Sequence, residues 1–222
     1  RTRRGAAALR KLATWNRTPD DGDGRLAFPD SPPRVAGLRS LLAVVGVPLG
    51  LGVGIYTGVL LGAIPARPFW NTPMVAQLFL FSALSTASAL LLLVAPRMRR
   101  AAGRDREMER LALVRADLLF IFLELFIVIP FIVHGKLSVL SAKEALGMVM
   151  GGPYTEVFWG GVVALGILLP LVLEVMDVTG ALRRLPRAIT RLVHVAAPLL
   201  ILVGGYLLRW VFVHAGQETS FL

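Results

Sequence analysis

Two acidic side chains stand inside an otherwise apolar stretch of the sequence. Asp117 and Glu124 lie between Leu111 and His134, and their spacing of seven residues places them on nearly the same face of a helix. An ionisable side chain at that depth in a bilayer costs about 2.5 to 3.5 kcal/mol on insertion scales, so it usually faces the bundle interior and serves a proton or substrate path. The sequence therefore predicts a proton path through Glu124 and Asp117.

The structural alternative is a protonated Glu124 that hydrogen-bonds to a serine of the preceding apolar stretch. Three serines there qualify: Ser82, Ser85 and Ser88. Glu156, which stands beside Tyr154 and Trp159 near the outer end of a later stretch, is a weaker candidate for the same proton path.

A tyrosine lies deep within the first apolar stretch. Glycines recur there at every fourth position, a pattern that lets a neighbouring helix approach closely: Gly46, Gly50, Gly54, Gly58 and Gly62. At roughly 100° per residue, Tyr56 projects nearly opposite to Gly54 and Gly58. Its phenol sits roughly 12 Å inside the boundary, counted from a helix end at Ile64 at about 1.5 Å per residue. A hydroxyl in hydrocarbon needs a partner, which is either a carbonyl of a neighbouring helix or a bound molecule.

A short loop rich in donors follows this stretch. Pro65 and Pro68 break the helix, and Arg67, Trp70 and Asn71 stand at the membrane boundary. The simplest interpretation is an interfacial anchor of arginine and tryptophan. The density of donors also favours a second interpretation, in which these three side chains shape the mouth of a binding pocket.

The sequence argues against metal centres held by this polypeptide. It has no cysteine, which excludes disulfides and iron–sulfur clusters ligated by its own thiolates. His134 and His214 fall at outer helix ends and His194 at an inner end, so no pair flanks a haem in mid-membrane. We expect neither haem nor an iron–sulfur cluster.

The elements that position these residues are membrane-spanning helices. Hydrophobic residues make up 55% of the 222 positions and charged residues 17%, against about 25% charged in a soluble domain. Apolar stretches long enough to cross a bilayer predict an all-α, polytopic membrane bundle over residues 37–222. Its five spans cover about 38–64, 73–96, 111–134, 156–175 and 192–213. Residues 1–36 are predicted to be a basic amphipathic segment and a linker at the cytoplasmic surface.

The number of basic residues alternates between high and low in successive connections between the spans. Nine Lys and Arg precede position 41, one lies in the Arg67 loop, six lie in 97–110, two follow His134, and four lie in 183–191. The positive-inside rule places the N-terminus in the cytoplasm and the C-terminus outside. Since the net charge of +10 comes from these clusters, it indicates contact with membrane lipid and not with nucleic acid.

Several segments together resemble the NrfD / polysulfide reductase membrane-subunit family. They are Tyr56–Gly62, Arg67–Asn71, Leu84–Ala87, Gly204–Arg209 and Ala215–Gln217. The resemblance implies a quinone-reactive membrane subunit without a cofactor of its own. Its partners would be an iron–sulfur subunit and a molybdopterin or multihaem cytochrome subunit. A tyrosine matched by Tyr56 would hold the quinone.

The match corresponds to the C-terminal half of a typical family member. The sequence starts at Arg1 without an initiator methionine, so either it is part of a longer protein or another polypeptide supplies the missing helices. The expectation is a non-autonomous subunit of a quinone-linked respiratory oxidoreductase in a bacterial cytoplasmic membrane, with menaquinone or ubiquinone as substrate. The alternatives are a proton-translocating or transporter-type subunit without redox chemistry, and a structural anchor.

Overall fold

The computed structural model describes residues 33–98 and 106–219 of the chain. Most of the predicted amphipathic segment and linker therefore lies outside the described residues, and its last four residues, 33–36, begin the first described helix. The chain divides into two units between Val45 and Gly46, and the helix bundle belongs to the unit Gly46–Leu222.

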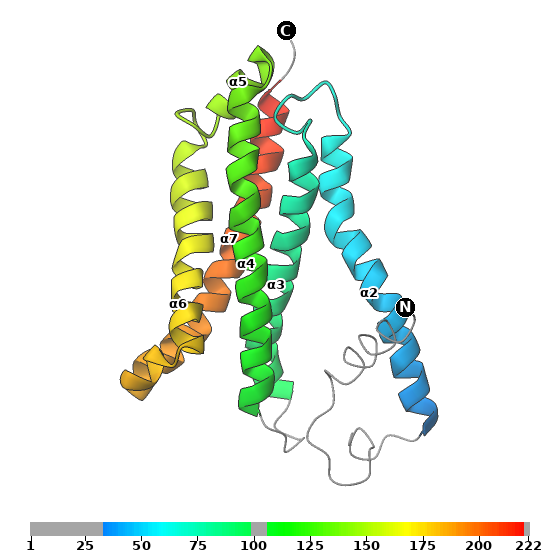
Figure 1. Cartoon of the computed structure of the whole chain (residues 1–222), viewed down its shortest axis with the longest axis vertical. Helices are drawn as coiled ribbons and strands as arrows, with labels where there is room; N and C mark the ends of the chain where they lie inside the picture. The colour runs from blue at the N-terminus through cyan, green and yellow to red at the C-terminus, as the bar shows by residue number, and fades with distance from the viewer. Residues whose placement is uncertain (1–32, 99–105, 220–222) are drawn as a thin grey trace, which may run out of the picture. The chain divides into compact units, whose positions relative to one another are not determined.

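The described part of the chain is almost entirely helical and contains no strand (Figure 1). In chain order the helices are α2 (Pro33–Gly62), α3 (Pro73–Met98), α4 (Arg106–Leu137), α5 (Leu140–Gly147), η2 (Val157–Leu168), α6 (Leu169–Val178), η3 (Ala181–Arg184) and α7 (Arg187–Glu218). The predicted all-α class is confirmed.

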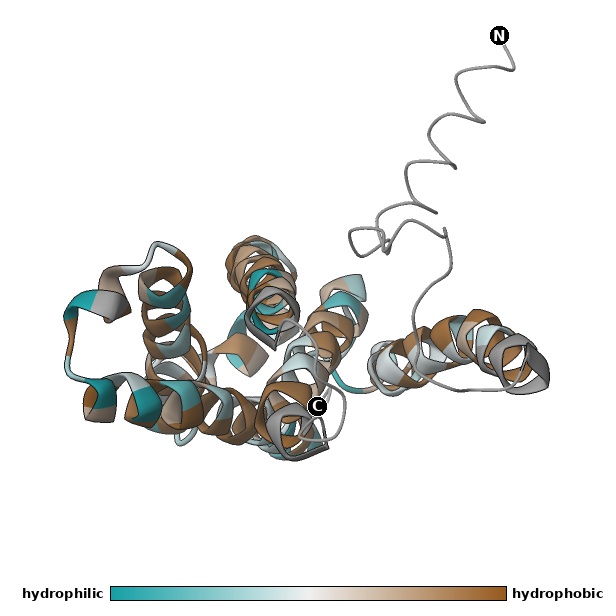
Figure 2. Ribbon diagram, turned by 90° about the horizontal axis from the view of Figure 1, so that it is seen from below, coloured by the Kyte–Doolittle hydropathy of each residue, from teal (hydrophilic) through white to brown (hydrophobic). Residues whose placement is uncertain are grey.

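Five helices in the described residues are long and apolar enough to cross a membrane, as the sequence predicts. Their spans are Ser40–Gly62, Pro73–Val94, Arg110–Leu137, Val157–Val178 and Arg187–Glu218. Apolar residues, brown in Figure 2, dominate these helices. The last helix extends beyond the predicted 192–213 at both ends, because charged residues near a helix end can reach the membrane surface while the helix continues.

The fourth span is built from two kinds of helix. Residues Val157–Leu168 form a π-helix, and the α-helix α6 continues it to Val178. Pro170 has no amide hydrogen to donate within a helix, and the π-helical segment ends two residues before it. Composition and length predict this span, whereas nothing in its apolar pattern indicates the wider helix.

The bundle is organised around α3 and α7. Helix α3 packs against α4 and α7, while the fourth span packs against α7 through η2 and against α4 through α6. Gly166 of η2 and Gly204 of α7 lie close together, since a Cβ added to Gly166 would lie 2.5 Å from the Cα of Gly204. Glycine at both positions therefore allows the two backbones to touch.

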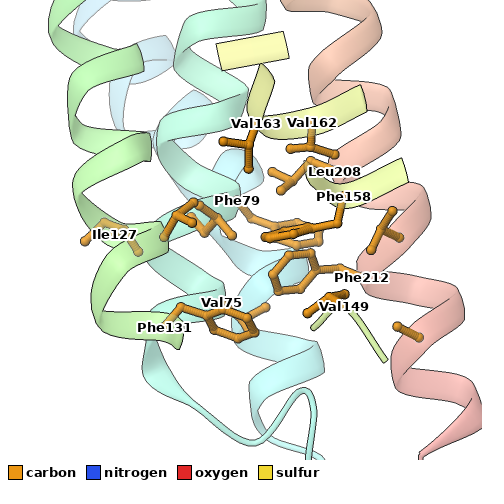
Figure 3. Close-up of a cluster of buried hydrophobic side chains, with 14 of the residues drawn as sticks. Val75, Phe79, Ile127, Phe131, Val149, Phe158, Val162, Val163, Leu208 and Phe212 are labelled. Atoms are coloured by element: carbon orange, nitrogen blue, oxygen red, sulfur yellow. The ribbon is translucent and has the colours of Figure 1, made fainter. Parts of the chain in front are cut away.

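An aromatic cluster closes one end of the bundle interior. Phe131 of α4 packs against Phe69 and Phe212, with ring centroids 5.6 and 5.2 Å apart, and Phe79 lies 5.9 Å from Phe212. Figure 3 shows Phe79, Phe131 and Phe212 among buried valines and leucine from the neighbouring helices. All four phenylalanines are at most 4% exposed, so they leave little room for water.

Helix α2 contacts α3 at two of its glycines, Gly54 and Gly58. An added Cβ on Gly58 would lie 2.6 Å from the Cα of Ala76, and one on Gly54 would touch Leu80 and Ala83. In contrast, a Cβ on Gly46 or Gly50 would meet nothing within 4 Å. The predicted small-residue contact is therefore present at Gly54 and Gly58, while most of α2 remains exposed.

Candidate functional site

Helix α4 carries a line of polar side chains on one face. Arg110, Asp117 and Glu124 follow one another at seven-residue spacing, about 10 Å apart along a helix at 1.5 Å per residue. Asp117 is fully buried and Glu124 is 5% exposed. The two carboxyl groups that the sequence singles out therefore both face the bundle interior. We call Arg110, Asp117 and Glu124, together with the side chains of neighbouring helices that interact with them, the polar column.

Serines of α3 pair with the two carboxyl groups. Ser85 donates its hydroxyl to Oδ1 of Asp117 at 2.7 Å. Ser82, one turn away, interacts with the carboxyl group of Glu124, whereas Ser88 donates to the carbonyl of Leu84 within its own helix. Ser82 is therefore the serine nearest to the one that the structural alternative requires, and serines of α3 lie beside both members of the predicted proton path.

Arg209 of α7 completes the column beside Glu124. Its Nη1 donates to the carbonyl of Gly205 at 2.8 Å and lies 3.4 Å from Oγ of Ser82. Its guanidinium carbon lies 5.8 Å from the centre of the Phe79 ring. The positive charge of Arg209 acts on Glu124, so the buried carboxyl group has a counter-charge in the apolar interior.

At the other end of the column lies a cluster that the sequence interpretation missed. Asp177 of α6 accepts hydrogen bonds from both terminal nitrogens of Arg110 and lies 3.2 Å from Nε2 of His194. Glu174, one turn before Asp177, is 3% exposed and interacts with Asp117. The seven-residue repeat of Arg110, Asp117 and Glu124 in the sequence could have indicated that Arg110 belongs to the same face of α4. Glu174 could not be found in this way, because only the packing of α6 on α4 brings it next to that face.

Tyr56 lies on the face of α2 that points away from α3. Its side chain is 58% exposed within the chain, and its hydroxyl makes no hydrogen bond to any described residue. The predicted orientation opposite to Gly54 and Gly58 agrees with the contacts of these glycines with α3. In the described part of the chain, no backbone carbonyl of a neighbouring helix accepts a hydrogen bond from this hydroxyl.

Arg67 and Trp70 fasten the predicted loop to the end of α7. Arg67 donates to the backbone carbonyls of Gln217 and Thr219, the latter at 2.7 Å. The indole nitrogen of Trp70, which is 6% exposed, donates to the carbonyl of Phe212 at 2.6 Å. These donors are engaged with protein acceptors, so in this structure the two residues position the loop.

Asn71 lies beside a cavity at the same end of the bundle. The cavity has a volume of about 380 Å³ and is lined by Gly58, Val59, Gly62, Ala63, Asn71, Thr72, Pro73 and Ala76. Val59 and Ala63 follow Tyr56 by three and seven residues and therefore share its side of α2. The cavity accordingly begins about one helical turn from Tyr56, and Asn71 is an exposed polar group on its wall.

Glu156 is separate from the polar column. It is exposed at the start of the fourth span, and the structure does not bring it to Asp117 or Glu124. Nearby, the hydroxyl of Tyr154 donates to Oε1 of Glu218 at 2.6 Å. This hydrogen bond to a carboxylate raises the pKa of Tyr154, because it stabilises the protonated phenol.

The histidines stand apart from one another. His134 is exposed, His194 belongs to the cluster around Asp177, and His214 stacks on Trp210 with ring centroids 4.5 Å apart. Within residues 33–98 and 106–219, no three His, Asp or Glu side chains are arranged so that they could hold a metal ion.

Comparison with known proteins identifies the relatives of this polypeptide. The family model described as polysulphide reductase, NrfD, matches residues 29–220. The sequence is 34% identical to protein NrfD of Escherichia coli K12 over 191 residues. This matched region covers 82% of this chain and 54% of that protein. It is 32% identical over 184 residues to a polysulfide reductase chain of Wolinella succinogenes, with coverage of 79% and 53%.

A more distant relative is a selenate reductase subunit of Mesobacillus selenatarsenatis, 25% identical over 176 residues, which cover 78% of this chain and 38% of that protein. The sequence thus spans about half the length of the NrfD and polysulfide reductase relatives named above. No solved structure matches it. Five apolar helices in the described residues and a family match over most of the sequence indicate a multi-pass membrane protein. The chain belongs to the polysulphide reductase NrfD family and is related to subunits of polysulfide and selenate reductases.

Proposed function

We propose that this protein is a quinone-interacting membrane subunit of a bacterial respiratory oxidoreductase. The proposal depends on the hydroxyl of Tyr56, which lies within a membrane-spanning helix. This hydroxyl has no hydrogen-bond partner among the described residues, and the residue lies about one helical turn from a cavity. A polar donor beside an apolar cavity is the arrangement that orients a flat ligand with a carbonyl group.

The cavity and its surroundings suit a quinone ring. Its volume of about 380 Å³ falls in the range of small-molecule sites. Tyr56 would donate a hydrogen bond to one quinone oxygen, and Asn71 would serve the ring from the cavity wall. Arg67 and Trp70 would act through the loop, which they hold against α7.

Oxidation of a quinol releases two electrons and two protons, and each needs a destination. We propose that the electrons pass to an iron–sulfur subunit, because this polypeptide has no cysteine with which to hold a cluster. That subunit would in turn serve a molybdopterin or multihaem cytochrome subunit. Relatives named as parts of polysulfide and selenate reductases support an assembly of this kind. Helices beyond the length of this sequence would complete the site.

Protons would move through the polar column. Asp117 and Glu124 are buried, serines of α3 lie beside both, and the positive charge of Arg209 acts on Glu124. Glu156 lies outside the column and would not take part. With the N-terminus in the cytoplasm, the Arg110 end of the column would face the cytoplasm and the quinone cavity would lie near the outer surface.

The column also favours a second function. A line of buried carboxyl groups would serve a proton-translocating subunit that has no redox site of its own. The two functions differ in whether a quinone analogue binds near Tyr56.

Helix α2 provides the test. Gly58→Ala places a methyl group 2.6 Å from the Cα of Ala76, so α2 must move away from α3 and the cavity lined by Gly58 changes shape. We expect the affinity of the assembled complex for a quinone analogue to fall about tenfold, corresponding to ~1.4 kcal/mol. The measurement is a titration that follows the fluorescence of the analogue.

The matched control is Gly50→Ala, since a Cβ there meets nothing within 4 Å. It should bind the analogue as the unmodified complex does. Equal affinities for both variants and the unmodified complex would place the quinone elsewhere.

A further inference from the structure

A second cavity lies at the opposite end of the polar column from the aromatic cluster. Its volume is about 340 Å³, and its polar lining comes from three helices: Arg110 of α4, Glu174 and Asp177 of α6, and His194 of α7. The remaining lining is apolar, with Leu92, Val114 and Pro198 among it. Four ionisable groups thus meet in a space within the membrane-spanning part of the protein.

The two carboxyl groups of this cavity have different surroundings. Both oxygens of Asp177 are held, by Arg110 and by His194. Neither oxygen of Glu174 has a hydrogen-bond partner among the described residues, although Glu174 is only 3% exposed. An unsatisfied polar group in hydrocarbon costs several kcal/mol. A proton shared with Asp117 would engage only one oxygen of Glu174, so the other oxygen needs a partner that is not a described side chain.

Water fits this requirement. A cavity needs about 10 to 15 Å³ of accessible volume for one water molecule, and the water needs two or more polar partners. The cavity exceeds that volume many times, and Glu174, Asp177 and His194 supply the partners. Water in it would reach the carboxyl oxygens of Glu174.

Beyond Glu174 the column continues inward. Its carboxyl group interacts with that of Asp117, whose Oδ2 likewise lacks a donor while Oδ1 accepts from Ser85. Two adjacent carboxyl groups form a hydrogen bond only when one of them carries a proton. The pair can therefore take up a proton from one side and release it to the other.

We infer that Glu174 is the group that exchanges protons between a water-filled cavity and Asp117, with Asp177 fixed between Arg110 and His194 as the charged wall of that cavity. This inference deepens the proposed function, because it names the place where the polar column meets water. It rests on that function, since the proposed quinol oxidation is what would supply protons to the column. The step moves one proton between water and the Glu174 carboxylate, and then between Glu174 and Asp117, without oxidation or reduction.

The test uses a lipid-soluble carbodiimide, dicyclohexylcarbodiimide, on the full protein in membranes. The reagent forms a stable adduct with a protonated carboxyl group in apolar surroundings, and mass spectrometry locates it. We expect an adduct on Glu174 that falls at least about fivefold from mildly acidic to alkaline pH, because only the protonated form reacts. The charged and titratable groups facing Glu174 are Arg110, Asp117, Asp177 and His194, and they set the pH at which the labelling decreases.

Exposed Glu156 is the internal control and should carry little adduct. Glu174→Gln should remove the adduct, and the unmodified protein already gives the pH profile if that variant does not fold. No adduct on Glu174 at any pH, or equal labelling of Glu156, would overturn the inference. Protection of Glu174 by sodium ions at constant pH would also overturn it, in favour of a cation site. Labelling needs no quinone, so its failure leaves the proposed quinone site untouched, and loss of quinone binding leaves the labelling untouched.

Discussion

Replacing Tyr56 with phenylalanine should lower the affinity of the assembled complex for quinone about tenfold, and quinol oxidation at limiting quinol should slow in proportion. The substitution removes one hydroxyl and keeps the ring, so the loss reports a hydrogen bond of ~1 to 2 kcal/mol. The measurements are a titration with a quinone analogue and the rate of quinol oxidation by the complex in membranes.

Tyr206 offers a matched control for this substitution. It lies on α7 and is likewise exposed, at 66% against 58% for Tyr56, and neither hydroxyl bonds to a described residue. Tyr206→Phe should leave both measurements unchanged. If Tyr56→Phe and Tyr206→Phe bind the analogue equally, the phenol of Tyr56 does not hold the ring.

Replacing Glu124 with glutamine should uncouple proton movement from quinol turnover. Glutamine has nearly the same shape and can still bond to Ser82, so the helices should keep their packing, but it cannot release a proton. We expect the proton transfer that accompanies quinol oxidation to slow on the order of 100-fold, the lower end of what positioned proton-transfer groups contribute. A pH-sensitive dye in sealed vesicles measures this transfer.

Glu156→Gln is the control, since Glu156 is exposed and lies outside the column. It should leave proton transfer as it is. Quinol oxidation with normal proton transfer in the Glu124→Gln complex would show that protons do not pass through the column, and would leave Glu124 as a structural partner of Ser82.

The spans were predictable from the sequence because a bilayer imposes a minimum length on apolar helices. The uncharged stretches on either side of Arg67 gave α2 and α3, and their structural ends lie close to the predicted ones. The fourth span was harder, since its apolar residues do not reveal that Val157–Leu168 is π-helical. The orientation of the termini stays a prediction of the positive-inside rule.

The candidate site was predictable where it depends on position within one helix. The direction of Tyr56 and the shared face of Asp117 and Glu124 follow from helix geometry alone. Contacts between helices do not follow from it. Trp70 bonds to the carbonyl of Phe212, which lies 142 positions away, and no local pattern indicates that acceptor.

Glu174 is a second residue whose surroundings depend on contacts between helices. The predicted fourth span, 156–175, already contains Glu174 next to its end, where a charged side chain typically reaches the membrane surface. In the structure the span continues to Val178 and Glu174 is 3% exposed. The packing of α6 on α4, which the sequence pattern does not reveal, therefore makes Glu174 a member of the polar column.

The central claim is that a quinone ring binds next to Tyr56, and photoaffinity labelling tests it most directly. A quinone carrying a photoreactive azide would be illuminated in membranes that contain the complex, and the labelled peptides of this protein would be identified by mass spectrometry. The proposal predicts label on the segments that surround the cavity, residues 56–63 and 71–76, and displacement of that label by unmodified quinone. Label that unmodified quinone displaces from other segments of this protein, with none on these two, would contradict it.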